Sequence, residues 1–189
     1  MKLRFIPSLF LLVLICLVAG CYGTKPMIYP NAKLTSKETM EHVDLLLQNG
    51  DWLMTYSKDV QSITKDTPFS LVGIYDEVTK KVLLADVSGV RAIPLTQLFA
   101  ESRRVVAIRP VWSTDVWTPK AVERAWELVG TKLGGVAAPE QQHFSSAFLS
   151  EVYRPFSPVG TRTKGNVIPT VIHPNNLHHW GRVVFDFGN

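Results

Sequence analysis

An apolar run near the N-terminus decides how much of this chain can contribute to a folded domain. The run extends from Phe5 to Val18 and follows the positively charged start Met-Lys-Leu-Arg. It is shorter than the roughly 20 apolar residues that a membrane-spanning helix needs. A charged start, a short apolar core and small residues after it are typical of a secretory signal peptide. The sequence therefore predicts that segment 1–20 is removed on export.

The end of the apolar run indicates the kind of export. It reads Val18-Ala19-Gly20-Cys21, which resembles the lipobox of bacterial lipoproteins, where the cysteine becomes the first mature residue and is acylated. The resemblance implies palmitate or related acyl chains on Cys21 and anchoring to a membrane of the cell envelope. Tyr22, not aspartate, follows the cysteine, and by resemblance to Gram-negative sorting patterns this implies the outer membrane and a domain facing the periplasm. The alternative is an ordinary signal peptide that contains a cysteine. Several acyl chains give stable anchoring because each buried methylene contributes about 0.8 kcal/mol.

Cleavage before Cys21 changes what the composition implies. Of 189 residues, 169 remain after residues 1–20 are removed, enough for one domain with a substantial core. The removed segment contains Lys2 and Arg4 and no acidic residue, so the formal net charge falls from +4 to +2, which does not indicate nucleic-acid binding. The two cysteines are Cys16, which leaves with the signal peptide, and Cys21. The mature chain therefore has no free thiol for a disulfide, a metal site or a cysteine nucleophile.

The pattern of the mature chain predicts a tether over 21–35 followed by one domain over 36–189. Thr35 and Glu38 form a capping-box pattern ahead of a short helix that ends at Asn49-Gly50. Further helices are expected over 95–100, from Thr118-Pro119 onward, and from Ser145 to Pro155. Strands are expected over 52–56, 69–75, 81–87, 105–111 and 182–187, with 69–75 and 81–87 forming a hairpin. This order predicts an α+β domain with a mainly antiparallel sheet packed against helices.

Four stretches of the domain, in chain order, resemble one family. They are Leu47-Gln48-Asn49-Gly50-Asp51-Trp52-Leu53, then Ser70-Leu71-Val72-Gly73-Ile74-Tyr75, then Val82-Leu83-Leu84-Ala85-Asp86 with Gly89-Val90-Arg91 and Pro94-Leu95, and last Phe144-Ser145-Ser146-Ala147-Phe148-Leu149-Ser150-Glu151-Val152-Tyr153. They resemble the Gly-Asp lead-in, the Ser-His-Val-Gly-Ile strand, the Ala-acid strand and the Phe-Cys-Ser-x-Phe-Val helix start of the permuted papain-like amidases, relatives of the NlpC-type cell-wall hydrolases. The segment 172–177 resembles that family's Thr-Pro-x-x-Leu tail. The resemblance covers about residues 45–180 and implies a permuted papain-like fold.

The chemistry of that family needs three groups. A cysteine at a helix N-terminus is acidified by the helix dipole and by an imidazole, the imidazole takes and returns the proton, and a third polar group orients it. The resemblance places the histidine position at Leu71, the acid position at Asp86 and the cysteine position at Ser145. An acid is still present at the orienting position, Asp86. The base position holds leucine, which cannot accept a proton, and the nucleophile position holds a serine hydroxyl in place of a thiol. The leading hypothesis is a catalytically silent member that serves as a binding or structural module of the envelope, with a small acyl or peptide ligand in the degenerate cleft.

The competing hypothesis is a serine-dependent amide or ester hydrolase that acts through Ser145 on cell-wall peptides or on N-acyl and lipid substrates. A serine needs a base more than a cysteine does, so this hypothesis requires a substitute for the histidine lost at Leu71. His143, two residues before Ser145, is the first candidate, and His173, His178 and His179 lie in the tail. The adjacent histidines His178 and His179 have no acidic residue at a spacing typical of metal ligands, so no metal site is predicted. No cofactor is implied either.

Two observations have simpler explanations beside the functional ones. A purely interacting envelope protein would use Trp112, Trp117 and the loop around Pro155 and Pro158, because tryptophan in loops can mark an interface. Packing of these aromatic rings between strand and helix is the interpretation we favour. A carboxylate at a strand end is usually a turn or surface residue, which is the simpler explanation for Asp86. The resemblance implies instead that Asp86 lies near the former active-site cleft, as a vestige that pairs with Ser145 or with Arg91.

Overall fold

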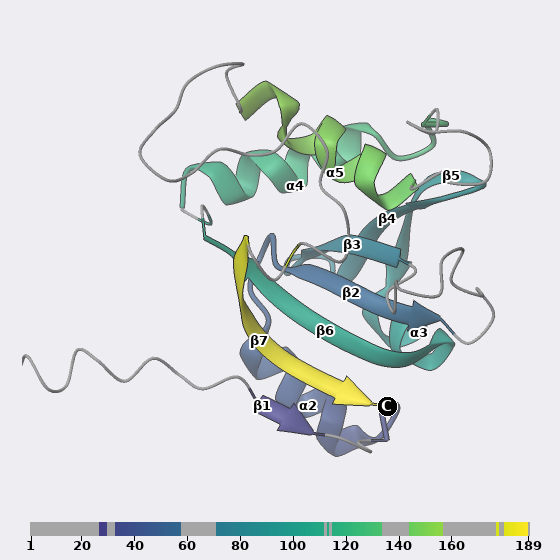
Figure 1. Ribbon diagram of the computed structural model, residues 1–189, viewed down its shortest axis with the longest axis vertical. Coiled ribbons are helices and arrows are strands. Elements are labelled where there is room, and N and C mark those ends of the chain that lie inside the picture. Colours follow the sequence, from purple (N-terminus) through teal and green to yellow (C-terminus); the bar gives the residue numbers. More distant parts are fainter. Residues whose placement is uncertain are drawn as a thin grey trace, which may run out of the picture.

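The computed structural model describes residues 27–29, 33–57, 71–111, 113, 115–133, 144–156, 177 and 180–188. These residues form an α+β domain built on one sheet with the strand order β1-β7-β6-β2-β3-β4-β5 (Figure 1). Neighbouring strands run antiparallel except β1, which pairs parallel to β7. The predicted α+β class and the mainly antiparallel sheet are confirmed.

Every strand and helix expected from the sequence is present, with modest shifts at the ends. The strands are β1 (Met27–Tyr29), β2 (Trp52–Ser57), β3 (Leu71–Asp76), β4 (Lys81–Asp86), β5 (Gly89–Pro94), β6 (Ser102–Pro110) and β7 (Gly181–Gly188). The helices are α2 (Lys37–Leu46), α3 (Leu95–Glu101), α4 (Trp117–Glu127) and α5 (Phe144–Tyr153), followed by the 3-10 turn η2 (Arg154–Phe156). The sequence missed β1 and β5.

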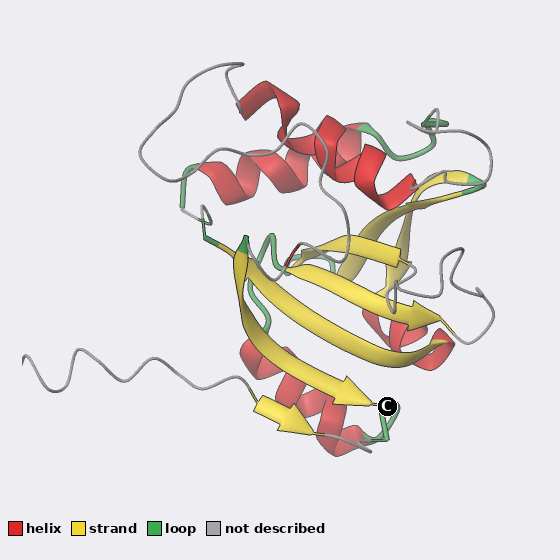
Figure 2. Ribbon diagram, in the orientation of Figure 1, coloured by secondary structure: helices red, strands yellow, loops and turns green. Residues whose placement is uncertain are grey.

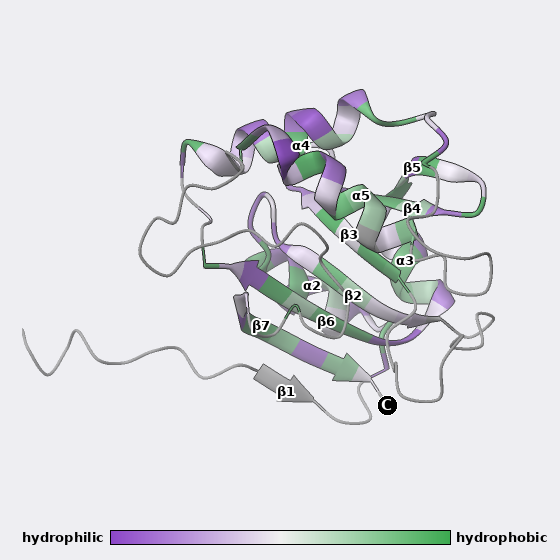
Figure 3. Ribbon diagram, turned by 45° about the horizontal axis from the view of Figure 1, so that its top comes forward, coloured by the Kyte–Doolittle hydropathy of each residue, from purple (hydrophilic) through white to green (hydrophobic). Residues whose placement is uncertain are grey.

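Helices cover both faces of the sheet, so the domain has two apolar cores (Figure 2). Alternate residues of each strand point to opposite faces. Val72 and Ile74 of β3 therefore pack under α4 and α5, whereas Tyr75 packs on the side of α2 and α3. Figure 3 shows the hydrophobic residues along β2, β6 and α5 that fill these cores. The helix pair α4–α5 thus holds the predicted nucleophile position against β3 and β4.

The Gly-Asp lead-in to β2 is fixed by a buried ion pair. Gly50 has φ +79°, a conformation that favours glycine, and a Cβ there would collide with the Thr118 side chain. Asp51 is fully buried and receives two hydrogen bonds from Arg109, Nε to Oδ1 at 2.8 Å and Nη2 to Oδ2 at 2.7 Å. Arg109 also donates to the carbonyl of Leu46 at the end of α2. Burial raises the pKa of the Asp51 carboxyl, and the hydrogen bonds from Arg109 oppose that rise.

Two predicted helix caps were wrong. The Oγ of Ser36, not of Thr35, accepts the Thr39 N–H at 3.2 Å and caps α2. Helix α4 begins at Trp117, one residue before Thr118, whose hydroxyl lies 2.9 Å from the Ser113 hydroxyl instead. The cap of α2 is thus one position later than predicted, whereas the N-cap of α4 is Val116, two positions before Thr118, and it makes no side-chain hydrogen bond to the helix. Local sequence patterns do not resolve helix ends to within one or two residues.

The N-terminal segment also departs from expectation at one point. The tether predicted over 21–35 does not hold for Met27–Tyr29, because these residues pair with Phe185, Asp186 and Phe187 as the edge strand of the sheet. Leu34, inside the same predicted tether, is buried in the core on the side of α2. The predicted signal peptide over 1–20 and Cys21 lie outside the described residues. Within the described part of the chain, no helix is long and apolar enough to cross a membrane.

Candidate functional site

Ser145, the predicted nucleophile position, lies in the first turn of α5 and is only 3% exposed. Its Oγ accepts a hydrogen bond from the backbone N–H of Val72 at 3.0 Å, and this bond is buried. The residue before Val72 is Leu71, the predicted histidine position. The structure therefore brings positions 71 and 145 next to each other, although they are 74 residues apart in the chain.

The geometry of the sheet explains why this N–H needs a partner. The ladder between β3 and β4 ends with Gly73 opposite Leu84. Tyr75 exchanges its main-chain bonds with Gly50 and Asp51 on the β2 side, and alternate residues of a strand direct these groups to opposite neighbours. The N–H of Val72 is therefore directed to the β4 side, beyond the end of the ladder. The Ser145 hydroxyl takes the place of the missing strand carbonyl.

Position 71 does not present a side chain suited to proton transfer. Leu71 is half-buried, and leucine has no acceptor. A Cβ placed on Gly73 would meet the side chains of Val82 and Leu84 and the backbone of Leu83. Val82 and Leu84 belong to the core beside α2 and α3, so Gly73 faces that side of the sheet. By strand alternation Leu71 is assigned to that same face, whereas Ser145 approaches from the face of α5.

Asp86, the predicted acid position, is a turn residue paired with an arginine. Its Oδ1 accepts the Ser88 N–H at 2.7 Å, and its Oδ2 accepts Nε–H of Arg91, also at 2.7 Å. The first bond closes the turn between β4 and β5, and the second holds β5 against β4. Of the two partners expected for Asp86, Arg91 is the one found. The β3–β4 ladder ends with Gly73 opposite Leu84. Continued by two residues in the same register, it would pair Leu71 with Asp86.

The remaining predicted groups lie outside the described residues. These are the lipidation residue Cys21 and the four tail and loop histidines, His143, His173, His178 and His179. In the described part of the chain the only histidine is His42, on the exposed side of α2 and across the sheet from α5. The described surroundings of Ser145 therefore contain no imidazole.

A hydrogen-bonded carboxylate that the sequence did not single out lies at the other end of β3. Asp76 is buried and accepts hydrogen bonds from the Val78 N–H, the Thr79 hydroxyl and Nε1–H of Trp126. Burial acts to raise its pKa, but the hydrogen bonds from Thr79, Trp126 and the turn outweigh it, and the pKa of Asp76 is lowered. The spacing Asp76 to Thr79 was a usable turn signal, whereas Trp126 is 50 residues away. This network fixes the β3–β4 turn to α4.

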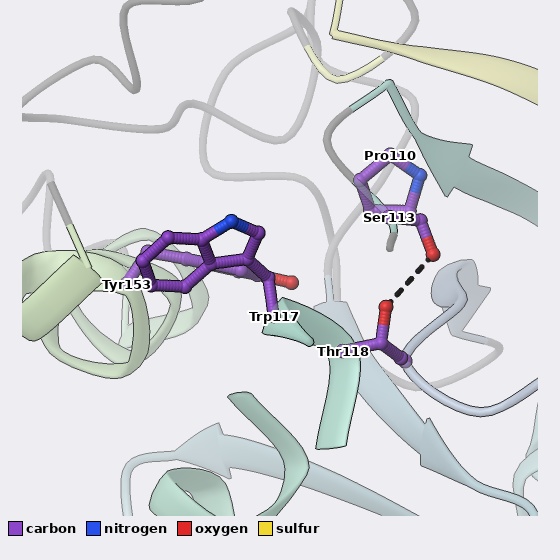
Figure 4. A pocket seen from close by; sticks show the side chains of 6 residues that line it. Pro110, Ser113, Trp117, Thr118 and Tyr153 are labelled. Carbon is purple, nitrogen blue, oxygen red and sulfur yellow. Dashed lines mark hydrogen bonds between the residues drawn. The ribbon is translucent and has the colours of Figure 1, made fainter. Parts of the chain in front are cut away.

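A small hollow lies at the C-terminal end of α5 (Figure 4). It encloses about 180 Å³ of space that includes open solvent, and it is lined by Gly50, Pro110, Ser113, Trp117, Thr118 and Tyr153. Tyr153 follows Ser145 by eight residues, about 12 Å along the helix, so the hollow is separate from the predicted nucleophile. Trp117 is 42% exposed and meets the Phe156 ring edge-on. Trp117 is therefore an exposed residue with one edge-on ring contact, and it is not packed between strand and helix as the favoured interpretation expected. Trp112 lies outside the described residues.

Comparison with known proteins found no matching family model, no matching curated protein and no matching solved structure. The α+β class therefore comes from the structure itself. The assignment to the permuted papain-like amidases remains a prediction from the residues quoted above.

Proposed function

We propose that this chain is an outer-membrane lipoprotein, anchored through lipid on Cys21, whose domain is a permuted papain-like fold without a working nucleophile and base. In this proposal the domain serves the envelope as a binding or structural module. The observation that supports it best is the hydrogen bond from the Val72 N–H to the Ser145 hydroxyl.

That bond gives Ser145 a structural role at the position where the family has its nucleophile. One lone pair of Oγ is engaged by the sheet, and the residue is 3% exposed, so a substrate carbonyl has little access to the oxygen. A serine hydroxyl also needs an adjacent base to become nucleophilic. Leu71 offers none, and the carboxylate of Asp86 is engaged by Ser88 and Arg91.

The second candidate function is a serine hydrolase acting through Ser145. One observation favours it: Ser145 lies in the first turn of α5, where the helix dipole stabilises developing negative charge. His143 is its substitute base in that case. The two candidates predict opposite behaviour toward reagents that react with activated serines.

A fluorophosphonate probe separates these candidates. The full chain, extracted in detergent, is treated with the probe beside an active serine hydrolase, and turnover of N-acyl amino acids, lipid esters and cell-wall peptides is measured on the same preparation. We expect neither labelling nor turnover. Labelling that disappears in Ser145→Ala but persists in Ser150→Ala, a matched change on the same helix, would show that the silent-module proposal is wrong.

The anchor is tested independently of the active site. Cells are grown with labelled palmitate, and the protein is recovered from separated inner and outer membranes. We expect label in the wild-type protein, no label in Cys21→Ser, and recovery of the wild-type protein with the outer membrane. A full-length, unlabelled wild-type protein would contradict the anchor.

A further inference from the structure

The placement of β1 makes the connection between lipid and domain short. β1 begins at Met27 and is hydrogen-bonded into the sheet beside β7. Only residues 22–26 separate its first residue from Cys21, so six Cα–Cα steps join Cys21 to Met27. Six residues span at most about 20 Å even when fully extended. A tether ending at residue 35, as the sequence suggested, would have allowed more than twice that reach.

The position of β1 in the sheet gives this short connection a direction. β1 is one outer strand of the sheet and β5 is the other, with five strands between them. Neighbouring strands lie about 4.8 Å apart, so β5 is about 29 Å from β1 across the sheet, and β3 is about 19 Å from it. Figure 1 shows β1 and α2 at one end of the molecule and β5 with α5 at the other.

We infer that the β1 edge of the domain lies against the lipid surface into which the acyl chains of Cys21 insert, and that the β5 edge points away from it. This inference rests on the proposed lipid anchor. Helices cover both faces of the sheet, so the two faces resemble each other in this respect. The two outer strands differ in their distance from the anchor, because only β1 is close to Cys21 along the chain. The part of the domain that contains α5 and β3 then lies further from the lipid than β1, on the side where cell-wall or periplasmic ligands are nearer than the lipids of its own membrane.

The absence of other thiols makes the orientation measurable. Apart from Cys21, the mature chain contains no cysteine, so an introduced cysteine is the only group that a maleimide dye can label when Cys21 is acylated. Lys33→Cys places a dye on an exposed residue four positions after β1, and Val87→Cys places one at the 80% exposed turn between β4 and β5. Both variants of the full-length lipidated protein are inserted into phosphatidylethanolamine and phosphatidylglycerol vesicles that contain an acceptor dye on the lipid headgroups.

The expected result is stronger energy transfer from the Lys33→Cys dye, by about twofold or more, because the two edges are about 29 Å apart across the sheet. A flexible Gly-Ser spacer of about 20 residues before Met27 adds about 25 Å of root-mean-square reach and should reduce transfer and the difference between the dyes. Equal transfer from both dyes without the spacer would overturn the inference while leaving the anchor intact. Maleimide labelling of the wild-type protein would show a free thiol at Cys21 and would overturn the anchor together with the inference.

Discussion

Two serines on one helix allow the role of the Ser145 hydroxyl to be measured directly. Ser145→Ala removes the acceptor of the Val72 N–H and leaves this donor buried without a partner. An unsatisfied buried donor costs about 1–3 kcal/mol. Each kcal/mol shifts the melting temperature of a domain of this size by about 2–4 °C, so we expect a decrease of about 2–12 °C.

Ser150→Ala is the matched control. Ser150 lies on the same helix, and within the described structure its buried Oγ has no hydrogen-bond partner. Its removal breaks no bond, so we expect a change within about 0.5 kcal/mol of zero, or a small gain in stability. The two changes delete the same atom and have the same intrinsic effect on helix propensity.

The assay is urea and thermal unfolding of residues 21–189 in a Cys21→Ser background, followed by tryptophan fluorescence and circular dichroism. The free energy of unfolding should be lower for Ser145→Ala than for Ser150→Ala by at least about 1 kcal/mol. If both variants lose the same amount, or if Ser145→Ala loses nothing, the hydroxyl does not close the end of the β3–β4 ladder. The structural explanation for this serine would then be refuted.

Three further predictions concern the frame around the site. Asp51→Ala leaves the partly exposed Arg109 guanidinium without its carboxylate partner and should cost up to about 3 kcal/mol in urea unfolding, the low end for a buried pair; a cost below about 1 kcal/mol would contradict the importance of the pair. The pKa of Asp76 is lower in the folded state, so its stabilisation is present above the unfolded value of 3.8 and is lost as the pH falls through the folded value. The destabilisation by Asp76→Asn should accordingly be larger at pH 7 than at about pH 2, and an equal effect at both would count against the charged network. Gly50→Ala forces a positive φ on alanine and a contact with Thr118 and should lower stability by about 1–3 kcal/mol, which thermal unfolding would detect; an unchanged melting temperature would contradict the strain.

The strands and helices that the sequence predicted share one property: each has a run of apolar or β-branched residues long enough to set a period. The hairpin of β3 and β4 is of this kind. β1 has three residues, too few for a period, and its pairing depends on β7, more than 150 residues away in the chain. β5 begins at a glycine and includes Arg91 and Ala92 in half-buried positions, so neither face gives a clear alternation.

The site divides in the same way. The resemblance assigned family positions to Leu71 and Ser145, and it gave the Asp86–Arg91 pair as one of two expected outcomes for Asp86. The hydrogen bond of Ser145 depends on where the β3–β4 ladder ends, which is a property of two strands and a helix together. The Asp51–Arg109 pair joins residues that are 58 positions apart, and no local sequence pattern predicts such a contact.

The choice of serine at position 145 can itself be argued from the ladder end. An N–H···O bond of 3.0 Å is close to the ideal length, whereas a thiol is a larger and weaker acceptor. If catalysis were under way, the sulfur would be the better nucleophile and the loss of a strong acceptor would be tolerated. Leucine at position 71 supplies no base to favour a thiol, so under the proposed function the acceptor strength of the hydroxyl becomes the property that matters. If the proposed relation to the papain-like amidases holds, the leucine and the serine are therefore one change in physical terms, because a site without proton transfer gains a better closure of its sheet.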